Sequence, residues 1–223
     1  MAKRTTPDRR RKVEELKRQQ RKAERRRTLM IVGASGFIGL GLIAAVVVPS
    51  ALNWVKSPDR KSQVREIGVK LADAGCTPVK DFPKPKSAKH VEEGTTVTYD
   101  ANPPYGGDHW ANPASAAPKF VNRRDAVEVE RYVHSMEHGY VIVWYTGGAT
   151  DKDLEDLRAI AKKIGPKFIA VPWPRAPFAD GKAIGISAWR HTETCSSVSG
   201  EVIQDFYDKF HPPKGDAPEK AVL

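Results

Sequence analysis

The feature that most constrains this chain is an uncharged stretch from Thr28 to Val55. Its apolar centre, Leu29 to Val48, is 20 residues long. A helix of that length, rising about 1.5 Å per residue, spans the roughly 30 Å hydrocarbon layer of a bilayer. The stretch therefore predicts a transmembrane helix over residues 28–50 rather than a buried core helix. A cleaved signal peptide is the main alternative, since Ser50 and Ala51 would permit cleavage, but its apolar core usually has only about 7–15 residues.

The charge distribution predicts the orientation of this helix. Residues 1–27 hold thirteen Lys/Arg and four Asp/Glu, a net charge of +9, whereas the other 196 residues hold 24 Lys/Arg and 23 Asp/Glu. The positive-inside rule then places residues 1–27 in the cytoplasm as a basic tail and the chain from about residue 56 outside. We expect a single-pass protein of the cell membrane, with a signal-anchor, that contacts membrane lipid. Nucleic-acid binding is not expected, because the basic excess lies outside the folded part.

The remainder predicts one extracytoplasmic domain over residues 75–211, with residues 51–74 as a juxtamembrane linker or short helix and residues 212–223 as a disordered tail. Hydrophobic periodicity, capping residues and glycine or proline breaks define the elements. We expect strands at 95–99, 140–145, 167–171 and 183–189, and helices at 125–138, 151–164 and 199–210. This order predicts an α+β domain, or a small α/β one, with a central sheet and flanking helices.

The chain has two cysteines, Cys76 and Cys195, both on the predicted outer side. Since that side is oxidising, a disulfide between them is expected, with two independent thiols as the alternative. The absence of a C-x-x-C pair argues against a thioredoxin-type redox site.

The six histidines also lie beyond the predicted span, and three of them suggest a metal site. His134 and His138 are four residues apart on one helix face, and Glu137 lies beside them. His109 follows a glycine-containing loop that can reach them, and His90 lies at the start of a strand. We predict a zinc or copper site of His109, His134 and His138, with His90 or Glu137 as a further ligand.

The sequence also predicts how the metal site would be supported and how its affinity would depend on pH. Asp108 is expected to orient a ligating imidazole from behind. Ligation needs neutral imidazoles, so metal affinity should fall below about pH 6, whereas replacing His211 on the tail should do nothing. The alternative is that His138 merely stabilises a helix end and that His134 is a hydrogen-bonded core residue.

The sequence His134-x-x-Glu137-His138 also matches the H-x-x-E-H pattern of inverted zincins. In that interpretation Glu137 is a general base, and Glu193 or Glu201 is the third ligand. Gly139 ends the predicted helix, whereas a zincin helix would continue. Three classes remain open: a domain that binds a metal or an envelope protein partner, a metal-dependent hydrolase, and an envelope scaffold with structural histidines only.

Several motifs together resemble a known family. They are Cys76-Thr-Pro-Val, Asn102-Pro-Pro-Tyr-Gly-Gly-Asp-His109, Val133-His-Ser-Met-Glu-His-Gly139 before a Trp-Tyr strand, and Ala188-Trp189 with Cys195. This set is similar to the bacterial domain-of-unknown-function 3105 family over about residues 75–210. The resemblance implies a basic tail, one span and an outer domain with a polar cluster, and it implies no activity. The family loop carries a serine where this chain has Gly106.

Overall fold

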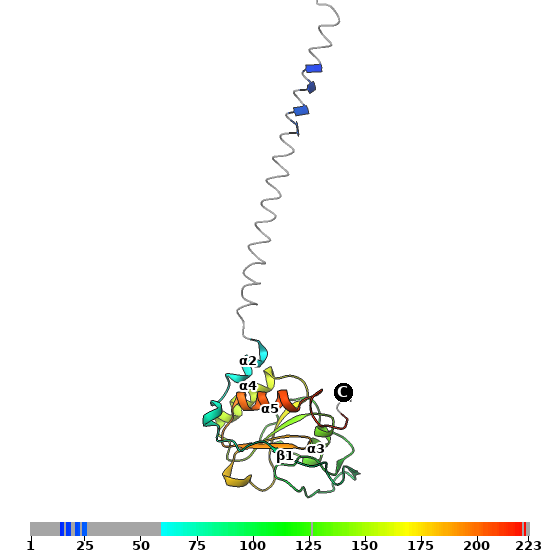
Figure 1. Ribbon diagram of the computed structural model, residues 1–223, viewed down its shortest axis with the longest axis vertical. Coiled ribbons are helices and arrows are strands. Elements are labelled where there is room, and N and C mark those ends of the chain that lie inside the picture. Colours follow the sequence, from blue (N-terminus) through cyan, green and yellow to red (C-terminus); the bar gives the residue numbers. More distant parts are fainter. Residues whose placement is uncertain are drawn as a thin grey trace, which may run out of the picture. The chain divides into compact units, whose positions relative to one another are not determined.

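The computed structural model describes residues 59–125, 127–219 and 221, together with eight residues between positions 14 and 25 (Figure 1). The chain divides into two units, residues 1–57 and 58–223. In the first unit the eight described residues are helical and exposed. The predicted span over residues 28–50 lies outside the described residues. Within the described residues, no helix combines the length and the apolar character that crossing a bilayer requires.

The second unit is an α+β domain built on a five-stranded mixed sheet. Its strands are β1 (Lys80–Asp81), β4 (Val141–Tyr145), β5 (Phe168–Pro172), β6 (Ile184–Ala188) and β7 (His191–Cys195), in the order β1-β7-β6-β4-β5. Only the β4–β5 pairing is parallel. All five residues of β4 are buried, as expected for an apolar strand with a neighbour on each side. The predicted central sheet with flanking helices is therefore confirmed.

The two faces of the sheet carry different helices. Val141, Val143 and Tyr145 of β4 pack into the core cluster that holds α2 (Arg60–Arg65), α4 (Asp151–Lys163) and α5 (Gly200–Phe210) residues. Ile142 and Trp144 point the other way, into the cluster that holds α3 (Val129–Glu137). Figure 1 shows α4 and α5 together on one side of the sheet and α3 apart from them. The sheet thus separates a helical core from the layer that carries α3.

Two sequence predictions around α3 were wrong for the same physical reason, which is that side chains took over backbone hydrogen bonds. The predicted strand at 95–99 pairs with no strand in the described structure, because the Val97 N–H donates to the Glu130 carboxylate at 2.8 Å and the Val97 carbonyl accepts from Arg175 at 2.7 Å. The predicted helix start at Asp125 is also wrong. The Asp125 carboxylate accepts from the Asn122 N–H at 3.0 Å and closes a turn, and the helix begins at Val129.

A second, two-stranded sheet completes the α3 side. β2 (His90–Val91) and β3 (His109–Trp110) run parallel, with His90 opposite His109 and Val91 opposite Trp110. The sequence predicted no strand at β3 or β7. Each departs from the apolar pattern, since β7 reads His-Thr-Glu-Thr-Cys and β3 is only two residues long. Short 3₁₀ turns, η1 (Leu71–Asp73) and η2 (Ala179–Gly181), connect the remaining segments.

Residues 59–74 pack against the rest of the domain and include the short helix α2, one of the two forms expected for the segment 51–74. Val64 of α2 is fully buried, and Gly68 bridges to Ser199 at the start of α5. The predicted pairing of the cysteines is confirmed, since the Cys76 and Cys195 sulfur atoms lie 2.03 Å apart. The disulfide therefore fastens this amino-terminal segment to β7.

The carboxy-terminal segment, expected to be disordered, lies against the domain as far as Glu219. Asp216 contacts both Arg190 at 3.2 Å and His191 at 3.0 Å, and Ala217 is buried in the α3 cluster. The Glu219 N–H donates to the Glu137 carbonyl at 3.1 Å. Charge pairing and one apolar anchor thus order a segment whose composition alone suggested disorder.

Candidate metal centre

Four potential metal ligands gather where β2, β3 and α3 meet. They are His90 of β2, His109 of β3, and His134 and Glu137 of α3, and each offers a ligand atom within 4.8 Å of the others. Two ligands of one zinc ion, each about 2.1 Å from the metal, lie about 3–3.5 Å apart. Side-chain adjustments of an ångström or less would therefore bring the four donors to bonding geometry.

The backbone explains why these residues converge. His90 and His109 are paired in register across the parallel ladder, so their side chains lie on the same face. His134 and Glu137 are three residues apart on α3 and therefore neighbour one another on one helix face. The three imidazole rings pack against each other, with centroids 4.7 to 5.1 Å apart.

Backbone carbonyls set the orientation of two of these rings. Nδ1 of His109 lies 2.8 Å from the Gly107 carbonyl, and Nδ1 of His134 lies 2.7 Å from the Trp110 carbonyl. A carbonyl oxygen only accepts, so each Nδ1 must carry the proton. In the neutral ring Nε2 is then an unprotonated acceptor aimed at the cluster. This is the arrangement in which protein histidines bind metal ions.

One contact inside the cluster is unfavourable as it stands. Nε2 of His109 lies 3.0 Å from a Glu137 carboxylate oxygen, yet it is buried without a hydrogen-bond partner. His109 is 0 % exposed and Glu137 7 % exposed. An imidazole lone pair therefore faces a carboxylate oxygen out of contact with water. Two acceptors at this distance require a proton or a cation between them.

Burial shifts the protonation of the cluster toward neutral forms. Desolvation lowers the pKa of His109 and of His134, and neighbouring histidines lower both further. Desolvation likewise raises the pKa of Glu137, with the nearby Glu219 carboxylate adding to the effect. Neutral imidazoles are the forms that ligate metals, whereas the raised pKa of Glu137 favours a proton on that carboxyl group, which a bound cation would have to displace.

The glycine loop before β3 allows the close approach of His109. Gly106 and Gly107 have φ of +140° and +130°, which other residues rarely adopt. A Cβ at Gly106 would lie 2.9 Å from a Pro85 side-chain carbon and 3.2 Å from the Trp189 ring. The glycines are therefore required both by backbone conformation and by space.

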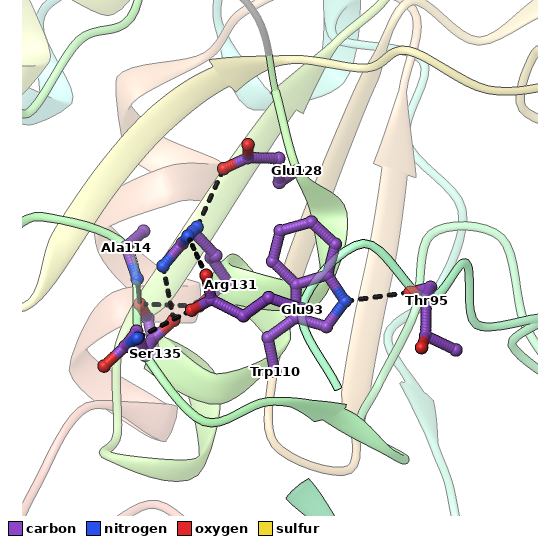
Figure 2. A network of polar contacts seen from close by, with 8 residues as sticks. Glu93, Thr95, Trp110, Ala114, Glu128, Arg131 and Ser135 are labelled. Atoms are coloured by element: carbon purple, nitrogen blue, oxygen red, sulfur yellow. Dashed lines mark hydrogen bonds and ion pairs between the residues drawn. The ribbon is translucent and has the colours of Figure 1, made fainter. Parts of the chain in front are cut away.

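A polar network fastens α3 to the loops on either side of β3 (Figure 2). Arg131 pairs with Glu93 at 3.0 Å and with Glu128 at 2.8 Å. The Trp110 indole N–H donates to the Thr95 carbonyl at 2.8 Å. Ser135 accepts from the Ala114 N–H at 3.2 Å. These contacts hold the ligand-bearing segments in place from outside the cluster.

Other residues predicted for the site lie elsewhere or act differently. His138 is outside the four-ligand group: its ring stacks on His134 with centroids 4.7 Å apart, and its Nδ1 lies 3.6 Å from Glu219. Among the described residues no hydrogen bond from an imidazole to Asp108 is found; its carboxylate accepts from the Lys89 N–H at 2.8 Å and so holds the backbone next to His90. The Gly107 carbonyl takes the role expected of Asp108.

The acids suggested as a zincin ligand are also outside the group. Glu193 lies near the sulfur atoms of Cys76 and Cys195, which the disulfide already occupies. Burial raises the pKa of Glu193 to about 7. Glu201 lies in the first turn of α5 and accepts from the Leu71 N–H at 3.4 Å. His211, expected on a disordered tail, stacks on Tyr207 with centroids 4.3 Å apart, so it is no neutral control.

The fold and the cluster define a class: a disulfide-linked α+β domain with a cluster of one exposed histidine, two buried histidines and one buried glutamate. A family profile matches residues 90–222, described as a protein of unknown function (DUF3105). The chain belongs to this family, as its motifs suggested, and the match contains all four cluster residues. No curated protein and no solved structure shows significant similarity to the chain.

Proposed function

We propose that this protein binds a divalent transition metal, zinc or copper, through His90, His109, His134 and Glu137. The contact between His109 Nε2 and the Glu137 carboxylate carries the proposal, because two buried acceptors lie 3.0 Å apart. A proton shared by this pair would relieve the contact. It would not account for the convergence of His90 and of the free His134 nitrogen on the same place. A cation accounts for all four donors.

The donor set also suggests which cations would bind. Imidazole nitrogens suit zinc and copper, whereas magnesium and calcium prefer sites made of oxygen. Three imidazoles and one carboxylate leave a zinc site with an overall charge of +1. The buried Glu137 carboxylate would then be neutralised without an ion pair to a lysine or arginine.

Binding is better supported than hydrolysis. In a zincin-type enzyme Glu137 would remain free to act as a general base. Here its carboxylate is one of the converging donors, and the acids considered as a replacement ligand, Glu193 and Glu201, contact other parts of the domain. The geometry therefore favours Glu137 as a ligand.

The proposed site would be displayed outside the cell membrane. The uncharged stretch from Thr28 to Val55 and the basic residues before it support an anchor with a cytoplasmic amino terminus. A disulfide is compatible with an oxidising compartment on the outer side. Reporters joined before Pro58 and after Leu223 would test this topology, with cytoplasmic activity of the second reporter contradicting it.

Metal analysis of the full-length chain, purified without a polyhistidine tag, tests the binding proposal. We expect one zinc or copper ion per chain, and binding that weakens as the pH falls and the imidazoles take up protons. His134→Ala should lose at least about 100-fold in affinity, beyond the range typical of supporting groups. Glu155→Ala, an exposed change on α4, is the matched control. Unchanged binding by His134→Ala would contradict the proposal.

A further inference from the structure

His90 differs from the other three proposed ligands in two respects. It is exposed, whereas His109, His134 and Glu137 are buried. In addition, no hydrogen bond to its ring is found among the described residues, whereas backbone carbonyls fix the rings of His109 and His134. Within the described part of the chain, the contacts found for the His90 ring are with other rings, with centroids 4.8 Å from His134 and 5.1 Å from His109.

We propose that His90 is an exchangeable ligand, and that a small nitrogen or oxygen donor from solution takes its place on the metal. This inference rests on the proposed function, because it concerns the same site. The three buried donors would hold the ion. The coordination position filled by His90 would be the one at which the ion reacts with another molecule or is passed to it. Three fixed protein ligands and one replaceable position distinguish metal sites that act on other molecules from closed structural sites.

The structure supports this division of roles through the elements that carry each ligand. His134 and Glu137 belong to a nine-residue helix that is buried along almost its whole length. His109 follows two glycines packed against Tyr99, Pro85 and Trp189. His90 belongs to a two-residue strand, which is paired on the described structure only with β3. Moving His90 would therefore disturb less of the domain than moving any other ligand.

The position of His90 also determines the side from which a donor from solution can reach the metal ion. The buried ligands block access from α3 and from the glycine loop, so an incoming donor reaches the ion from the solvent side, where the His90 ring lies. Such a donor competes with a tethered imidazole, whose high effective concentration favours the protein ligand. Exchange therefore requires a large excess of the solution ligand over the protein.

Cobalt(II) substitution in the full-length chain tests the proposal, because the visible absorption of bound cobalt reports its ligands. We expect a tetrahedral cobalt spectrum that changes on titration with azide, since azide differs from the imidazole that it would displace. His90→Ala should keep one cobalt ion and respond to azide at a concentration at least about tenfold lower, since the tethered competitor is absent. His109→Ala, which removes a buried ligand, is the matched variant and should lose the cobalt.

The outcomes separate this inference from the function on which it rests. Bound cobalt whose spectrum does not change with azide would overturn the exchange proposal and leave metal binding intact. The same conclusion follows if His90→Ala loses cobalt as completely as His109→Ala while its circular dichroism remains that of the wild type. If the wild-type chain binds neither cobalt nor zinc nor copper, both proposals fail.

Discussion

The helices α3 and α4 lie in different core clusters and are built in opposite ways. α4 begins with a capping box, in which Thr150 and Asp153 exchange hydrogen bonds, and six of its thirteen residues are buried. α3 has no side-chain cap at its amino end, yet eight of its nine residues are buried, among them His134, Ser135 and Glu137. Local sequence rules thus account for α4, whereas surrounding structure must hold α3.

This difference separates stability from function within one domain. Leu154, Leu157 and Ile160 of α4 bury apolar surface, which stabilises the fold without the need for hydrogen-bond or charge partners. α3 instead turns a carboxylate and imidazoles inward, which costs free energy unless partners are supplied. A helix that buries polar ligands at the expense of stability is typical of a functional site.

The largest expected effect comes from the core of α4. Leu157 is fully buried, so Leu157→Ala should lower the free energy of unfolding by about 2–5 kcal/mol through lost burial and a cavity. Denaturant titration measures this loss. Metal stoichiometry of the protein that remains folded should not change. If metal affinity under native conditions fell in proportion to the loss of stability, the core around α4 and the metal site on α3 would not be energetically independent.

A smaller effect is expected at the two helix starts. Thr150→Ala removes the cap of α4 and should cost about 0.5–2 kcal/mol. Glu128→Ala at the corresponding position of α3 removes no cap hydrogen bond, only an exposed pairing with Arg131, and should cost less than about 0.5 kcal/mol. The same denaturant titration compares them. Equal losses would contradict the contrast between the helices.

The last expected effect has the opposite sign. In metal-free protein, Glu137→Gln replaces a buried carboxylate by an amide that can donate to His109 Nε2, now without a partner. We expect the free energy of unfolding to rise by about 0.5–1.5 kcal/mol, while stabilisation by added zinc is lost. Glu137→Ala, which supplies no donor, serves as the control. A destabilised Glu137→Gln would show that the carboxylate already has a satisfactory partner.

The same contrast explains how much of the fold the sequence predicts. β4, β5, β6, α4 and α5 were predicted within about two residues, because apolar periodicity and caps define them locally. β7 was missed, since its alternation of threonine with His191 and Glu193 carries little apolar signal. α3 was placed four residues too early, because Asp125 resembles a helix cap but closes a turn.

The candidate site was predicted in part. His109, His134 and Glu137 follow from helical spacing and a flexible loop, and they do converge. The sequence ranked His138 above His90, because spacing on a helix is visible in the sequence whereas the pairing of His90 with His109 is not. The orienting carbonyls of Gly107 and Trp110 could not be predicted either, because any residue has a carbonyl and only the fold selects one.

The hydrogen bond from the Glu219 N–H to the Glu137 carbonyl brings the chain at Glu219 to the last turn of the ligand-bearing helix. A fusion joined after Leu223 would therefore begin only a few residues from the candidate centre. A carboxy-terminal polyhistidine tag would offer rival imidazoles beside it, and a bulky reporter would pull on the segment that contacts Glu137. Purification handles for this protein therefore belong at the amino-terminal end of the chain.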